Sequence, residues 1–139
     1  MVENIPQVSE FGEGYHGFWT YNIYNINAHF GTADSLKALT DEVHRRGMYI
    51  MVDVVVNNVA VAGNASQINY AKDIMPPFND KKYFHQPAVG IKFDDQWSVQ
   101  NGWLAIEKVS LADLDTESQY VQDVWHKWVK DLVSTYNRT

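Results

Sequence analysis

The longest apolar pattern in the chain runs from Met48 to Val56, interrupted only by Asp53 and followed by Asn57 and Asn58. A β-branched apolar run without alternation is typical of a strand whose two faces are both covered, as in a parallel sheet between helices. The pattern therefore predicts a buried parallel strand over residues 48–56. Polar groups at the carboxyl end of such a strand lie where α/β folds bind ligands.

An amphipathic pattern just before this run predicts a helix. Thr32 is placed to cap it, Leu36, Leu39 and Val43 recur along one side, and Gly47 is placed to end it. Because the predicted strand follows at once, helix and strand form an α-then-β step of a parallel architecture.

A second helix is predicted near the end of the chain. Thr116 and Gln119 have the spacing of a capping box at its start. One apolar stripe follows at helical spacing, namely Val121, Val124, Trp125, Trp128, Leu132 and Val133.

Two further segments lack such periodicity. Residues 3–31 are rich in Gly, Asn and aromatic residues, and although Tyr21 and Ile23 hint at alternation, we predict a long ordered loop. The stretch from Asn58 to Asp115 is far longer than ordinary strand-to-helix connections, which take about 2 to 6 residues. Its aromatic residues are numerous enough for a small core, so we predict an inserted subdomain; they are Tyr70, Phe78, Tyr83, Phe84, Phe93, Trp97 and Trp103.

Composition narrows the classes of function. With 139 residues, 45% of them hydrophobic, the chain suits one domain with a sizeable core. A net charge of -6 with only 11 Lys and Arg argues against nucleic acid as a partner. We also expect no membrane span and no signal peptide within this sequence. The absence of cysteine excludes disulfides, thiolate metal sites and thiol nucleophiles, and leaves the compartment open.

Several motif searches end in rejection. Residues 12–17 match the dinucleotide fingerprint G-x-G-x-x-G, but Pro6 interrupts what precedes them and aromatic residues follow where a helix is needed. The histidines show no metal-ligand spacing such as H-E-x-x-H, and no G-x-S-x-G elbow exists. Rossmann, zinc and serine-nucleophile interpretations therefore lack support.

Three separated stretches carry a family resemblance: GYHGFW at residues 14–19, GMYIMVDVVVNN at 47–58 and VSLADLDT at 109–116. In this order and spacing they resemble the α-amylases of fungal, secreted type, a glycoside hydrolase family. The resemblance implies an α/β fold, a segment of a (β/α)8 TIM barrel comprising the loop after strand 2, helix 2, strand 3 and helix 3. It places a barrel segment at 1–57, an inserted small domain B at 58–112, and the barrel helix after strand 3 at 113–139.

The resemblance also implies roles for single residues. Asp53 matches a carboxylate that orients a catalytic-site Arg. Asn57, Asp113 and the backbone carbonyl of Gln100 match ligands of a structural calcium, an ion that takes about 6 to 8 oxygen ligands. An alternative is open for each, since a lone Asp in an apolar run is often a buried structural residue, and Asn residues at a strand end often form turns.

Another group of residues matches the sugar-binding positions of the family, whose substrate is starch or malto-oligosaccharide. His16 and Trp19 match pocket-lining residues, and Phe18 stands where a Tyr stacks on a glucose ring. Asn58 stands where the family carries a His that hydrogen-bonds the sugar, and Phe93 replaces a Tyr. Stacking needs only a flat apolar face, but Phe18 and Phe93 both lack the hydroxyl.

Other departures concern stability and catalysis. Gln100 replaces an expected Glu, and Ala88 and Gly102 replace a disulfide of fungal members that would typically contribute about 2 to 4 kcal/mol. We expect the catalytic carboxylates of the family to lie outside this sequence, so no catalytic residue is assigned. Retaining glycosidases need two carboxyl groups about 5 to 5.5 Å apart.

Three interpretations of function follow. The first is a fragment of an α-amylase-like hydrolase of internal α-1,4-glucosidic bonds, extracellular by family and inactive alone. The second is a truncated, non-catalytic remnant with residual glucan or calcium binding. The third is an unrelated α/β binding domain. We further expect the chain to need additional barrel segments to fold, because a central strand exposes unpaired backbone groups on both edges.

Overall fold

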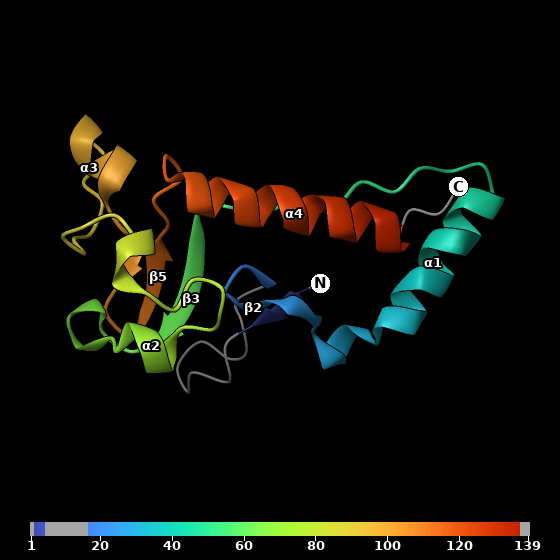
Figure 1. Ribbon diagram of the computed structural model, residues 1–139, viewed down its shortest axis with the longest axis horizontal. Coiled ribbons are helices and arrows are strands. Elements are labelled where there is room, and N and C mark those ends of the chain that lie inside the picture. The colour runs from blue at the N-terminus through green and yellow to red at the C-terminus, as the bar shows by residue number, and fades with distance from the viewer. Residues whose placement is uncertain (1, 5–16, 137–139) are drawn as a thin grey trace.

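The computed structural model describes the backbone of residues 2–4 and, with side chains, residues 17–136 (Figure 1). Two small antiparallel sheets are present in this part of the chain. The first pairs β1 (Val2–Asn4) with β2 (Thr20–Ile26), and the second has the order β3-β5-β4. The strands of the second sheet are β3 (Asn58–Ala62), β4 (Ala105–Ile106) and β5 (Val109–Asp113).

Two long helices accompany the sheets. They are α1 (Ala33–Arg45) and α4 (Gln119–Tyr136). The shorter helical segments are η2 (Ala28–Phe30), η3 (Ala65–Gln67), α2 (Tyr70–Asp73), η4 (Lys81–Tyr83) and α3 (Gln96–Asn101). In Figure 1, α4 runs along the length of the molecule, with the β3-β5 sheet, α2 and α3 at one end and α1 at the other.

Helix α1 confirms the sequence prediction and shows its cause. The Ser35 backbone N–H donates to Oγ1 of Thr32 at 3.1 Å, and the Thr32 backbone N–H donates to Oγ of Ser35 at 2.7 Å, which closes a capping box. Gly47 follows the helix with a φ of 69°, a left-handed conformation that favours glycine.

The predicted loop over residues 3–31 is wrong in part. Residues Thr20–Ile26 form a seven-residue strand, so the alternation at Tyr21 and Ile23 was a true strand signal. Ile23 is buried, whereas Tyr24 is largely exposed. The alternation covers only a few positions, and the Asn-rich, aromatic composition around it is typical of a loop. The strand was therefore not predicted.

The predicted strand over residues 48–56 does not form. This segment is an irregular connection between α1 and β3, and the first hydrogen-bonded strand after α1 begins at Asn58. Tyr49 and Met51 are 97% and 96% exposed. A parallel strand has its N–H and C=O groups paired by neighbouring strands. No described strand pairs with this segment, so the apolar run does not form the strand that its sequence predicts.

Helix α4 carries the predicted apolar stripe but not the predicted cap. Val121 and Trp125 are buried. The helix begins at Gln119 itself, so Thr116 lies in the preceding turn, and the Thr116 carbonyl accepts a hydrogen bond from the Gln122 side chain at 2.9 Å. The capping-box prediction is therefore wrong by most of a helical turn.

The aromatic insertion has a core that continues into α4. Phe78, Phe84 and Trp103 are almost fully buried, and they share one cluster with Val121 and Trp125 of α4. Phe78 and Trp125 have ring centroids 5.5 Å apart. Two of the aromatics expected in this core lie outside it, since Phe93 is 87% exposed and Trp97 about half exposed.

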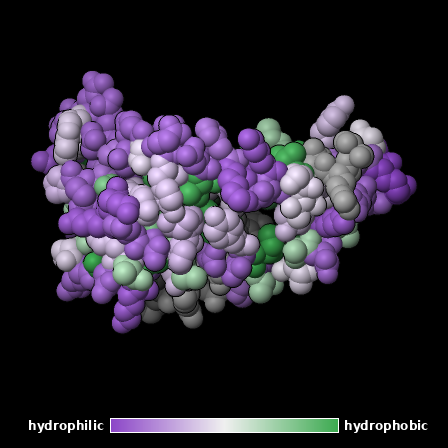
Figure 2. All heavy atoms as spheres, in the orientation of Figure 1, coloured by the Kyte–Doolittle hydropathy of each residue, from purple (hydrophilic) through white to green (hydrophobic). Residues whose placement is uncertain are grey.

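The outer surface is mainly polar. Figure 2 shows hydrophilic residues over most of one face, with small apolar patches near the middle of the molecule. Among the described helices, none is long and apolar enough to span a membrane.

Candidate functional site

A chain of polar side chains links the start of the insertion to its end. Nδ2 of Asn57 donates to Oδ1 of Asp113 at 2.8 Å, and Oδ2 of Asp113 lies 2.6 Å from Nδ1 of His85. On the other side of the imidazole ring, Nε2 lies 3.0 Å from Oε2 of Glu117 and 3.7 Å from Oδ1 of Asp115. We call these five residues the neck cluster.

The backbone of the insertion builds this cluster. Strands β3 and β5 pair with Asn58 opposite Asp113, which places Asn57 beside the end of β5. The Leu114 N–H donates to the Asn57 carbonyl at 2.8 Å, and the His85 N–H donates to the Asp113 carbonyl at 3.0 Å. These main-chain bonds hold the backbone beside the Asn57, His85 and Asp113 side chains.

Burial and charge shape the protonation of the cluster. Burial raises the pKa of the Asp113 carboxyl above its usual value, and the hydrogen bonds from His85 and Asn57 only partly offset this. Burial by itself would lower the pKa of His85, but hydrogen bonds to Asp113 and Glu117, together with the charge of Asp115, raise it. The hydrogen bond from His85 lowers the pKa of Glu117.

The donors of the neck cluster suit a metal ion. Asp113 and Asn57 bring a carboxylate and an amide together, and these groups supply the hard oxygens that calcium prefers. His85, Asp115 and Glu117 offer ligand atoms that all lie within 4.8 Å of one another. A group of side chains able to hold a metal is thus present beside the Asn57–Asp113 pair.

Two residues predicted for the metal and the catalytic surroundings take no part in the hydrogen bonds of this cluster. Gln100 is exposed on α3, and no hydrogen bond among the described residues joins it to Asn57 or Asp113. Asp53 is exposed within the irregular 48–56 connection. The described contacts test neither role, so both stay predictions.

The predicted sugar-binding residues divide into three groups. Trp19 lines an open surface hollow of about 400 Å³ together with residues of the β4–β5 turn, and Phe18, the residue before it, is half exposed. Asn58 is buried in β3, whereas Phe93 is exposed. His16 lies outside the described residues.

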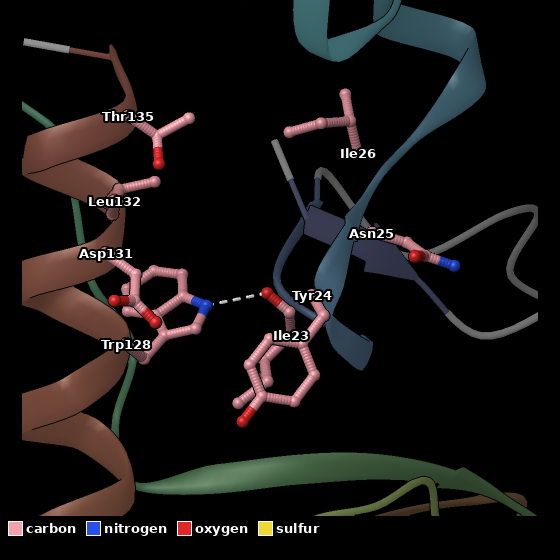
Figure 3. A pocket seen from close by; sticks show the side chains of 8 residues that line it. All are labelled: Ile23, Tyr24, Asn25, Ile26, Trp128, Asp131, Leu132 and Thr135. Carbon is pink, nitrogen blue, oxygen red and sulfur yellow. Dashed lines mark hydrogen bonds between the residues drawn. The ribbon is translucent and has the colours of Figure 1, made fainter.

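A cavity lies between β2 and α4. It has a volume of about 120 Å³, and in Figure 3 residues of β2 face residues of α4 across it. Nε1 of Trp128 donates to the Ile23 carbonyl at 2.7 Å and ties the two elements together. Its lining is mostly apolar, and its one carboxylate, Asp131, pairs with Lys127. This cavity offers no catalytic pair.

Sequence reasoning missed His85. His85 is one of five histidines, none of which has metal-ligand spacing. Its partners Asp113 and Glu117 stand 28 and 32 residues later. Only the return of the insertion to its starting point brings these residues together, so no local spacing could reveal the contact.

Comparison with known proteins identifies the family of the chain. The model of the α-amylase catalytic domain matches residues 4–137. An α-amylase of Saccharomycopsis fibuligera is 46% identical over 137 residues, which are 99% of this chain and 27% of that protein. The structure of an α-amylase from Malbranchea cinnamomea has a TM-score of 0.84 at 42% identity, covering 98% of this chain and 29% of that one.

A bacterial structure extends the comparison. The α-amylase of Geobacillus thermoleovorans, solved in complex with acarbose, matches with a TM-score of 0.73 at 28% identity and covers 98% of this chain. The fold is therefore that of a segment of an amylase (β/α)8 barrel. The chain belongs to the α-amylase family, and it spans about 27% of the length of the curated relatives it matches.

Proposed function

We propose that the chain forms the calcium-binding and part of the substrate-binding region of a glycoside hydrolase that cleaves internal α-1,4-glucosidic bonds in starch or malto-oligosaccharides. One observation carries the proposal: Asn57 and Asp113, the two side chains expected to bind calcium, meet at 2.8 Å although 56 residues separate them. A family match over residues 4–137 supports the same assignment.

The donor chemistry of the pair fits calcium. The Asp113 side chain is only 6% exposed, so its carboxylate gains from a cation that replaces lost hydration. When bound, calcium would join Asn57, which precedes the insertion, to Asp113 at its end. To bind the ion, the Asn57 amide would turn its oxygen toward it. We propose the backbone carbonyl of Gln100 as a further calcium ligand.

The sugar-binding part of the proposal rests on Trp19. An indole beside an open hollow provides the flat apolar face that stacks on a glucose ring. The Geobacillus relative was solved in complex with acarbose, which supports a saccharide ligand for the proposed enzyme as a whole. His16, Phe18, Asn58 and Phe93 are our other substrate-binding candidates, and Asp53 our orienting residue.

The described residues do not supply a retaining-glycosidase pair. Such a pair needs two carboxyl groups about 5 to 5.5 Å apart that flank the scissile bond. Asp115 and Glu117 lie near each other, but both are close to His85, and His85 hydrogen-bonds Glu117. The Glu117 side chain is 81% exposed. We infer that the 139-residue polypeptide alone does not hydrolyse starch.

Two further statements belong to the proposal. Residues 58–112 are the inserted domain B, between a barrel segment at 1–57 and a barrel helix at 113–139, which the return of β5 to β3 supports. The protein works outside the cell, in keeping with the family resemblance.

A chimeric enzyme tests the proposal. This chain replaces the matching 137 residues of the Saccharomycopsis fibuligera α-amylase, which supplies the rest of the barrel. We expect reducing sugar to be released from soluble starch, and we expect the variant Asp113→Asn to lose activity that added calcium does not restore. The isolated chain, assayed beside it, should show no turnover.

One observation favours a second candidate, a non-catalytic glucan or calcium binder. Asn58 is buried and stands where the family resemblance implies a sugar-binding His. A folded chimera that binds calcium but releases no sugar, even as the variant Asn58→His, would support this candidate and contradict the first. If the chimera were inactive and its variant Asn58→His active, the missing activity would be due to the single substrate contact at residue 58.

A further inference from the structure

The turn that follows β3 contains the sequence Asn64-Ala65-Ser66, which has the N-x-S pattern of an N-glycosylation acceptor. We propose that Asn64 is a glycan attachment site and that its sugar projects from domain B. The inference rests on the extracellular location put forward above. A second match to the pattern, at Asn137, lies outside the described residues.

The side chains of this acceptor sequence are already arranged as a compact unit. Oδ1 of Asn64 accepts from the Ser66 backbone N–H at 2.9 Å and from the Ser66 hydroxyl at 2.8 Å. Both hydrogen bonds use the oxygen of the amide. The amide nitrogen, the atom that would carry the sugar, makes no hydrogen bond to the described residues.

Neighbouring contacts fix the direction in which Asn64 points. Ala65 is buried in the core cluster, whereas Asn64 and Ser66 on either side of it are exposed. The Ser110 hydroxyl donates to the Gly63 carbonyl at 2.7 Å, and the Gly63 N–H donates to the Lys108 carbonyl at 2.9 Å. A glycan on Asn64 therefore leaves the core contacts of the turn unchanged.

The modification has a balanced chemistry. The donor is an oligosaccharide linked through a diphosphate to a lipid. Nδ2 of Asn64 forms a bond to C1 of the first sugar, the bond between C1 and the phosphate oxygen breaks, and the lipid diphosphate leaves. The amide nitrogen gives up one proton to the transferring enzyme, and no oxidation or reduction takes place.

Expression of the full chain with a secretion leader in yeast tests the inference. Tryptic cleavage after Arg46 and Lys72 gives one peptide, residues 47–72, in which Asn64 is the only acceptor by pattern. After treatment with peptide N-glycosidase, which converts a glycosylated Asn to Asp, we expect conversion at Asn64. The variants Asn64→Gln and Ser66→Ala should lose it, and Ser66→Thr should keep it.

Asn69→Gln is the matched control, because Asn69 is an exposed Asn in the same peptide whose second following residue is Ala71. It should leave the glycan on Asn64 in place. An unmodified 47–72 peptide from the secreted chain would overturn the inference, as would glycan that survives Asn64→Gln within that peptide. Neither result depends on starch hydrolysis, so a failure here is distinct from a failure of the chimeric enzyme.

Discussion

Removing the imidazole of His85 should destabilise the neck cluster strongly. In the variant His85→Ala, the buried carboxylate of Asp113 keeps Asn57 as its one side-chain hydrogen-bond partner among the described residues. Breaking a buried ion pair by removing one partner costs about 3 to 5 kcal/mol. We expect about 3 kcal/mol, the lower end of that range, because Asn57 still donates to Oδ1 and because protonation of Asp113 relieves part of the penalty.

The assay is urea unfolding of the chimeric enzyme at neutral pH with calcium chelated. The matched control is Glu117→Gln, which removes the exposed partner on the other side of the same ring and should change the free energy of unfolding far less. Added calcium should reduce the loss in His85→Ala, since the ion supplies positive charge to Asp113. Equal losses in the two variants would refute the view that burial of Asp113 makes the contact important.

Three further outcomes are expected. Millimolar calcium should raise the melting temperature of the chimera in differential scanning fluorimetry. At a hundredfold excess over the dissociation constant, calcium should add about 2.7 kcal/mol to the free energy of unfolding. The variant Asp113→Asn should lose this response. Met51 is 96% exposed in this chain, and we expect the rest of the barrel to bury it. Met51→Lys should therefore destabilise the chimera by about 2 kcal/mol or more, because it buries a charge; an unchanged free energy of unfolding in urea would contradict that burial. Hydrogen bonds from Arg45 and Arg46 lower the pKa of Glu42 in the folded state. The ionised Glu42 should therefore stabilise α1 at pH values above its unfolded pKa of about 4.3, and this stabilisation should be lost as the pH falls through the folded pKa. Circular dichroism should show this loss of helix at acid pH in the parent protein and not in Glu42→Gln.

Sequence patterns succeeded where the structure depends on local contacts. The cap at Thr32 and the stop at Gly47 act within a few residues, and both were readable from residue type. The strand prediction for residues 48–56 was wrong for the opposite reason. An apolar run indicates side chains that need burial, but a strand also needs neighbouring strands to pair with its backbone.

The candidate site was predictable only through family resemblance. The Asn57 and Asp113 side chains lie 2.8 Å apart, and nothing in their spacing would have paired residues so far apart in sequence; their role as calcium ligands stays a prediction. His85 was missed altogether, because its contacts depend on how the insertion folds back. Thr116 was misjudged as a cap because the turn at Asp115 uses the same kinds of residues as a helix start.

The pairing of Asn58 with Asp113 has a consequence for how such proteins change. The insertion leaves and rejoins the rest of the chain at two residues that face each other across one antiparallel pair, about 5 Å apart. Everything between them can lengthen, shorten or be exchanged without moving the two points where the chain enters and leaves. A narrow neck of this kind lets a lineage vary the inserted domain while the rest of the fold keeps its geometry.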